Sequence, residues 1–187
     1  SYDGTVTVNG ELLSAKSDAG ADALAVGVNA GATSQGANSV AVGLDAAHDT
    51  QGVNSVAIGN ASGRNNQGNE SVSLGCQAGY GDQGTASVAI GFSSGYTSQG
   101  EYATAIGPSA GKKSQGDYST AIGVNAGETN QGSASVAVGW AAGQANQGAN
   151  GIIISSMGSS QTINHDNHIY IVCGTDNYIY YNGADEW

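Results

Sequence analysis

The chain has 187 residues, including 31 glycines and a single phenylalanine, so it lacks the large apolar side chains that fill an ordinary globular core. It carries 4 Lys and Arg against 15 Asp and Glu, a formal charge of −11, which argues against nucleic acid as a partner because nucleic-acid binding needs many basic side chains. No apolar run approaches the ~20 residues of a membrane span, so we expect no direct insertion into a membrane.

Residues 1–21 are predicted to form a short hairpin that leads into the rest of the chain. Residues 5–8 alternate Thr and Val, residues 9–10 are Asn-Gly, and residues 11–13 read Glu-Leu-Leu. Asn-Gly between two strand-like segments is the sequence typical of a tight β-turn.

Residues 22–148 contain eight repeats of sixteen residues without insertion or deletion. A glycine recurs at Gly27, Gly43, Gly59, Gly75, Gly91, Gly107, Gly123 and Gly139. A glutamine followed by glycine recurs at Gln35, Gln51, Gln67, Gln83, Gln99, Gln115, Gln131 and Gln147. Such a strict register requires each repeat to stack directly on its neighbours, which predicts an all-β parallel solenoid of eight coils.

Each repeat contains one short strand, as in residues 39–43, Ser-Val-Ala-Val-Gly. Because side chains alternate along a strand, Val40 and Val42 share one face and Ser39 and Ala41 the other. We expect the valine face to form a continuous aliphatic ladder inside the coil. We expect the column of small residues around Ala41 to face outward, against another copy of the chain.

The glutamine of each repeat is predicted to be structural. It is the same residue in all eight repeats, whereas a binding role does not require identity in every coil. Stacked glutamine amides can bond along the solenoid axis and to turn carbonyls, which satisfies polar groups that a thin coil cannot expose to water.

From residue 149 the repeat pattern is lost, and residues 149–187 are predicted to form a β-hairpin cap on the last coil. Residues 152–154 are Ile-Ile-Ile, residues 168–173 and 178–181 are strand-like, and residues 174–177 read as a turn. A cap of this kind protects the exposed strand edge of a solenoid.

The sequence contains no recognisable catalytic or cofactor motif. Cys76 and Cys173 lie far apart without metal-ligand spacing, and we expect no disulfide between them. His165 and His168 are weak metal candidates, since three copies of a histidine near a threefold axis can enclose an ion, but turn chemistry explains them better. We therefore expect no metal, no cofactor and no enzyme activity.

The strand blocks at residues 38–43, 54–59 and 134–139, Asn-Ser-Val-Ala-Val-Gly, Asn-Ser-Val-Ala-Ile-Gly and Ala-Ser-Val-Ala-Val-Gly, resemble the head repeat of YadA-like trimeric autotransporter adhesins. The sixteen-residue form looks like relatives in phage and large-virus fibres. The resemblance covers residues 22–148 and implies a left-handed parallel β-roll, a homotrimer around a threefold axis and a role in surface attachment. Bacterial adhesin heads usually have a shorter repeat, which favours a virion fibre over a bacterial outer surface as the location.

In a repeat scaffold the variable columns carry specificity. The column five residues after the strand glycine is diverse and contains the ligand-binding candidates His48, Arg64, Tyr80 and Tyr96. The column five residues before the glycine contains Tyr102 and Tyr118, again on successive repeats. Paired tyrosines suit sugar rings, although they can also simply stabilise adjacent strands.

The predicted function is attachment of a trimeric fibre or spike to a host-surface glycan or receptor. One alternative is a polysaccharide-degrading spike whose carboxylates meet between subunits, drawn from Asp45, Asp49, Glu70, Asp82, Glu101, Asp117 and Glu128. Another alternative is a purely structural spacer.

Phe92 and Trp140 share an apolar column with Leu44 and Val124, for which subunit packing is expected. Lys112 and Lys113 are read as a solvated corner.

Overall fold

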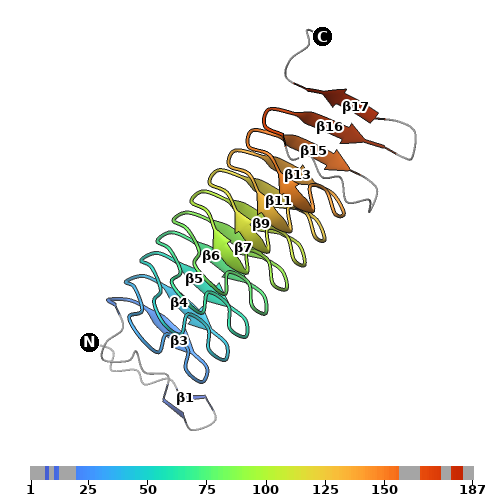
Figure 1. Ribbon diagram of the computed structural model, residues 1–187. Coiled ribbons are helices and arrows are strands. Elements are labelled where there is room, and N and C mark those ends of the chain that lie inside the picture. Colours follow the sequence, from blue (N-terminus) through green and yellow to red (C-terminus); the bar gives the residue numbers. More distant parts are fainter. Residues whose placement is uncertain (1–6, 9–10, 13–19, 156–164, 174–177, 183–187) are drawn as a thin grey trace.

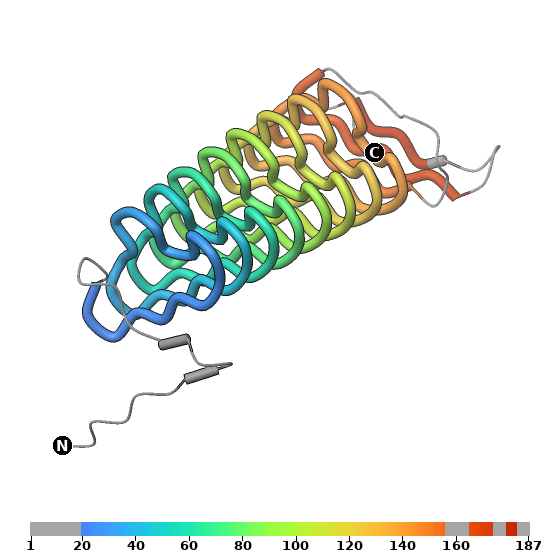
Figure 2. The backbone as a smooth tube through the Cα atoms, turned by 90° about the horizontal axis from the view of Figure 1, so that it is seen from below, coloured from blue at the N-terminus to red at the C-terminus, as the bar shows by residue number. Residues whose placement is uncertain are grey.

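The computed structural model is an elongated solenoid, in which the chain winds in coils that stack along one axis (Figure 1). The structure describes residues 7–8, 11–12, 20–155, 165–173 and 178–182, and these residues contain strands and turns but no helix. A view turned by 90° shows the coils following one another with nearly constant shape along the rod (Figure 2). The predicted all-β solenoid is therefore confirmed.

One sheet of eleven strands runs the length of the rod in the order β17-β16-β15-β13-β11-β9-β7-β6-β5-β4-β3. Its repeat strands are β3 (Leu24–Val26), β4 (Val40–Val42), β5 (Val56–Ile58), β6 (Val72–Leu74), β7 (Val88–Ile90), β9 (Thr104–Ile106), β11 (Thr120–Ile122), β13 (Val136–Val138) and β15 (Ile152–Ser155). They pair in parallel with an offset of sixteen residues at every step, from Leu24↔Val40 to Val136↔Ile152. These steps are the eight predicted coils.

A second, shorter ladder lies on another side of each coil. It consists of β8 (Thr97–Gln99), β10 (Lys113–Gln115), β12 (Thr129–Gln131) and β14 (Ala145–Gln147). In the earlier coils the same ladder continues as single bridges between successive glutamines, from Gln35↔Gln51 to Gln83↔Gln99. The backbones of successive glutamines therefore pair with each other, and these pairs set the register of the second ladder.

The C-terminal part extends the solenoid before it ends in a hairpin. β16 (Ile169–Val172) pairs in parallel with β15, and β17 (Tyr178–Tyr181) pairs antiparallel with β16. The predicted hairpin cap is therefore present, and its turn at residues 174–177 lies outside the described residues. Beyond the eight sixteen-residue steps, one further coil follows in which β16 pairs with β15 at an offset of seventeen residues and Asn167 N donates to Ala149 O.

Near the N-terminus, β1 (Thr7–Val8) and β2 (Glu11–Leu12) pair antiparallel, with Thr7 opposite Leu12. The predicted Asn-Gly turn between them, at residues 9–10, lies outside the described residues.

The interior of the coils is built from small side chains, and this reverses the predicted orientation of the strands. Seven residues of the alanine column have no exposed surface, namely Ala41, Ala57, Ser73, Ala89, Ala105, Ala121 and Ala137. The aliphatic residues between them point outward, and Ile58, Leu74 and Ile122 are exposed. Alternation identifies which residues share a face but not which face is inside. The sixteen-residue coils hold small side chains at the inward strand position, whereas β15, from which a seventeen-residue offset leads to β16, buries Ile153 there.

Each buried glutamine spans the interior of its own coil. Gln51 Nε2 donates to the carbonyl of Val40 at 2.9 Å, and Gln115 Nε2 donates to the carbonyl of Thr104 at 2.9 Å. The same bond recurs in the other coils, so the amide joins the second ladder to the main sheet rather than bonding along the axis as expected. A Cβ at Gly63 would lie 2.9 Å from the Gln67 amide, which explains a glycine at this corner.

The glutamine oxygen is satisfied differently in one coil. The Oε1 atoms of seven glutamines are buried without a hydrogen-bond partner among the described residues, namely those of Gln35, Gln51, Gln67, Gln99, Gln115, Gln131 and Gln147. In the remaining coil Ser73 replaces the usual alanine, and its hydroxyl donates to Gln83 Oε1 at 2.6 Å. Ser73 is therefore a stabilising variation of the interior.

Ala105→Leu should destabilise the rod because it forces a branched side chain into the filled interior. We expect a loss of roughly 1–3 kcal/mol or more in the free energy of unfolding, measured by chemical denaturation followed by circular dichroism. Ile106→Leu, on the adjacent outward position, is the control and should change stability much less. An Ala105→Leu protein as stable as this control would contradict the small-residue interior.

Ser73→Ala should lower the free energy of unfolding by about 1 kcal/mol, because it leaves Gln83 Oε1 buried without its donor. The reverse change, Ala121→Ser, places a hydroxyl at the equivalent position beside Gln131 and should be neutral or stabilising. Denaturation midpoints of the two variants measure both effects. If Ser73→Ala is neutral and Ala121→Ser destabilises, the hydroxyl–amide bond does not contribute to stability.

Candidate functional site

A long apolar surface is the outer side of the main sheet, which we call the aliphatic face. It consists of the outward residues of its parallel strands, two in each coil: Leu24, Val26, Val40, Val42, Val56, Ile58, Val72, Leu74, Val88, Ile90, Thr104, Ile106, Thr120, Ile122, Val136, Val138, Ile152 and Ile154. Leu74 is 42% exposed and Ile122 is 38% exposed. An apolar surface that continues over every coil is far more extended than the scattered apolar residues of an ordinary protein surface.

A second column of apolar residues follows the strand glycines and lies beside the aliphatic face. We call its apolar members the apolar corner, namely Val28, Leu44, Cys76, Phe92, Val124 and Trp140; the column also contains Asn60 and Pro108. Phe92 is 57% exposed and Trp140 is 60% exposed, which is unusual for such large rings. Together the two surfaces form one broad apolar side of the rod.

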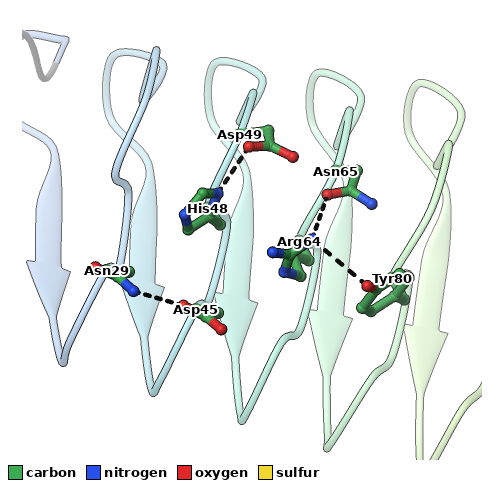
Figure 3. A network of polar contacts seen from close by, with 7 residues as sticks. All are labelled: Asn29, Asp45, His48, Asp49, Arg64, Asn65 and Tyr80. Atoms are coloured by element: carbon green, nitrogen blue, oxygen red, sulfur yellow. Dashed lines mark hydrogen bonds and ion pairs between the residues drawn. The ribbon is translucent and has the colours of Figure 1, made fainter.

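Tyr80 and Tyr96 stack on each other as the sequence predicted. Their ring centroids are 4.9 Å apart and the rings are inclined by 13°. Arg64 lies on the other side of Tyr80, with its Cζ 5.6 Å from the ring centroid and its Nη1 3.5 Å from the hydroxyl oxygen (Figure 3). His48, one coil earlier in the same column, bonds instead to its neighbour Asp49 at 2.7 Å. The structure thus brings Arg64 and the two tyrosines together and directs His48 away from them.

Tyr102 and Tyr118 form a second stack, with centroids 5.1 Å apart and rings inclined by 8°. They are 51% and 64% exposed, and their equivalents in the neighbouring coils are Ala86 and Ala134. Small flanking residues leave the outer ring faces of the pair uncovered, and we call this pair the tyrosine platform.

The backbone of the tyrosine platform is strained. Tyr102 has a φ of 56° and Tyr118 a φ of 57°, in the left-handed region that the whole column shares, from Asn38 and Asn54 to Ala86 and Asn150. A left-handed conformation costs a non-glycine residue roughly 1–2 kcal/mol, and asparagine tolerates it best. Bulky residues that keep such a conformation are often found at functional sites.

Most of the candidate catalytic carboxylates take part in local contacts between coils. Asp45 accepts a bond from Asn29 Nδ2 at 2.9 Å, Asp82 accepts one from Asn66 Nδ2 at 2.8 Å, and Glu128 accepts one from Gln144 Nε2 at 2.8 Å. Asp117 accepts a bond from the backbone N–H of Glu101 at 3.0 Å. Figure 3 shows the Asn29–Asp45 contact between two successive coils and the His48–Asp49 contact within one coil. These contacts are typical of side chains that stabilise turns and neighbouring coils.

At the C-terminal end, His165 and His168 lie close together, with ring centroids 5.5 Å apart, and His168 stacks on Tyr180 at 5.7 Å. In the part of the chain that the structure describes, no group of three or more metal-ligating side chains is present. Cys76 and Cys173 are both free thiols. The same described part contains no apolar helix of membrane-spanning length.

Two features were missed from the sequence. The aliphatic face was assigned to the interior, and the signal that identifies it as a surface is the invariant small residue at the alternate strand positions. The positive φ of the tyrosine platform was also missed, although Asn38 and Asn54 in the same column are typical of a left-handed position.

The chain matches the model of the YadA head domain repeat in two copies, at residues 19–46 and 98–126. No curated protein and no solved structure matches it significantly. The first matched segment contains β3 and β4, and the second contains most of β8 together with β9, β10 and β11. Two segments of the chain are therefore similar to the YadA head domain repeat.

Proposed function

We propose that the chain is a rigid attachment segment of a homotrimeric fibre or spike, which displays glycan-binding positions on its outer corners. The observation that carries the proposal is the aliphatic face on a rod built from adhesin-type repeats. Water contact along this whole face is unfavourable, at about 25 cal/mol for each Å² of apolar surface. A ligand of limited size covers only part of it, whereas a second and a third copy of the same rod match its length.

Three copies around an axis parallel to the rod would bring equivalent coils to the same height. Outward residues closest to the axis, such as those of the Val72 and Leu74 pair, would then meet residues of the same coil in the neighbouring copies, and the threefold rotation would close the assembly. The apolar corner extends the interface, with Phe92 and Trp140 as its largest side chains. The alanine column has no part in this contact, because it is buried inside each coil.

The tyrosine platform is the proposed contact for a neutral sugar ring. Its outer ring faces are free of large neighbours, and the carboxylates of Glu101 and Asp117 belong to the preceding column, where they can accept bonds from sugar hydroxyls. Sugar rings present C–H groups that pack on aromatic faces, while their hydroxyls need polar partners. Three such sites on one trimer would strengthen weak single contacts.

The proposed role is binding without catalysis. A glycosidase needs a pair of carboxyl groups about 5 to 9.5 Å apart across the scissile bond, one of them free to donate a proton. The contacts of Asp45, Asp82, Asp117 and Glu128 with amides and backbone N–H groups favour their structural use. The proposed location is the surface of a virion, with a bacterial outer surface as the alternative.

The intact chain should elute as a species of about three times its 18.4 kDa mass in light scattering after size exclusion. Leu74→Lys combined with Ile122→Lys should convert it to monomer, because the added charges would be buried between subunits. Thr97→Lys with Thr129→Lys is the matched control on the second ladder, where the equivalent position already holds Lys113. A wild-type monomer, or a control that dissociates equally, would contradict the proposed interface.

Tyr102→Ala combined with Tyr118→Ala should weaken binding to a neutral oligosaccharide by roughly tenfold or more, because two stacking rings are removed. The measurement is binding of the chain to an array of neutral hexose and N-acetylhexosamine oligosaccharides. Ala86→Ser with Ala134→Ser is the control beside the platform, and it should leave the rod and its stacking rings intact. Unchanged binding by the tyrosine variant would exclude the platform as the sugar contact.

A further inference from the structure

The basic side chains of this acidic chain are concentrated at one corner of the rod. Of the four Lys and Arg residues, Arg64, Lys112 and Lys113 lie at this corner, and Lys16 lies outside the described residues. The ion pair between His48 and Asp49 is the only one found among the described side chains, so none of the three basic groups has a carboxylate within 4.0 Å there. A chain with a charge of −11 offers many carboxylates, so unpaired basic groups at a single corner are unexpected.

Two of these basic residues enclose the Tyr80–Tyr96 stack. Arg64, Tyr80, Tyr96 and Lys112 occupy the same position in four successive coils, and we call them the donor row. Backbone bonds join the coils directly beside them, from Asn65 N to Tyr80 O at 2.9 Å, from Gly81 N to Tyr96 O at 2.8 Å and from Thr97 N to Lys112 O at 3.0 Å. Neighbouring members are therefore one strand spacing apart, about 4.8 Å.

The geometry of the stack presents hydrogen-bond donors to solvent. The two ring faces cover each other, and the guanidinium of Arg64 lies over the remaining face of Tyr80 (Figure 3). The groups not engaged in these ring contacts are the ring edges, which carry the positive end of the aromatic quadrupole, the phenol hydroxyls and the face of Tyr96 toward Lys112. Arg64 bonds to Asn65 and Tyr80 through Nη1 alone among the described residues, although a guanidinium has five N–H donors.

We propose that the donor row binds the carboxylate of an acidic sugar within a host-surface polysaccharide. This inference rests on the proposed attachment function. It adds a second sugar-binding position beside the tyrosine platform and specifies that the sugar bound there is negatively charged. The donor row spans three strand spacings, about 14 Å, so Arg64 and the phenol hydroxyls can bond the carboxylate of one sugar unit while Lys112 meets the carboxylate of another unit of the same chain. Arg64 supplies paired N–H donors that match a carboxylate, and Lys112 supplies a mobile charge at the other end.

A densely sulfated polymer fits this surface less well. Beyond the donor row, Asp49, Asp82 and Glu128 lie in adjacent columns or in the next coil, so a highly charged chain would meet repulsion on both sides. The tyrosine platform differs from the donor row in the charge of its surroundings, because its neighbours Glu101 and Asp117 are acidic. The two stacks therefore divide the surface into one position for a neutral ring and one for an acidic ring.

The test is calorimetric titration of the full chain with a galacturonic acid hexamer and with its methyl ester. The ester keeps the ring shape and removes the charge, so the acid should bind at least tenfold more tightly, with an affinity that falls as salt is added. Arg64→Gln and Lys112→Gln should each weaken binding of the acid by about tenfold, the value expected for a lost charge-assisted bond. Tyr80→Phe with Tyr96→Phe should weaken it while keeping the stack.

Lys113→Gln is the matched control, since it removes the same charge from the neighbouring residue outside the donor row. Equal losses for Lys113→Gln and Lys112→Gln would overturn the proposal in favour of a diffuse charge effect. Equal binding of acid and ester, or tighter binding of heparin than of the hexamer, would also overturn it. No binding of the acid, together with binding of neutral oligosaccharides at the tyrosine platform, would reject the donor row and leave the attachment function standing.

Discussion

The width of the coil interior is the constraint on which the other features of this protein depend. A coil of sixteen residues encloses the small residues at the inward strand positions, the buried residues of the turn and one glutamine. The glutamine amide spans this space and bonds to the opposite strand, so it replaces the apolar layer that a wider solenoid contains. Because the sixteen-residue coils hold small side chains at the inward strand position, the branched aliphatic residues of their strands are directed outward, and the rod acquires an apolar side that its own fold does not cover. Ile153, the inward residue of β15, is the exception.

The three sides of the coil consequently differ in chemistry while sharing one backbone. The main sheet is aliphatic outside and alanine-lined inside, the second ladder is polar outside and glutamine-lined inside, and the corners hold the variable residues. The aromatic stacks occur where two successive coils carry tyrosine at the same position, so their spacing of 4.9 and 5.1 Å follows from the stacking of the coils. A ligand-binding surface can thus be built by changing corner residues without altering the bonds that close the coil.

Much of this organisation is readable from the sequence. The constant period predicts direct stacking, and identical positions in successive repeats predict which side chains meet, as the two tyrosine pairs show. Which face of each strand points into the coil is not readable in the same way, because alternation is the same whichever face is inside. The usual assumption that the larger apolar side chains are buried is wrong for so narrow a coil. The ninth coil was missed for another reason: between Ser155 and His165 the chain adds a residue and loses the glycine and glutamine markers, while Asn167 keeps the left-handed conformation of Asn150.

The constant offset between coils also has a consequence for how such a rod can change over evolutionary time. Since each coil closes its own interior and meets its neighbours through the same bonds, duplication or deletion of one sixteen-residue unit changes the length by about one strand spacing and leaves every column aligned. A partial unit would instead shift the buried alanines and glutamines out of register. The reach of the molecule from its base and the chemistry displayed along its corners are therefore independent heritable traits, and selection can adjust either one alone.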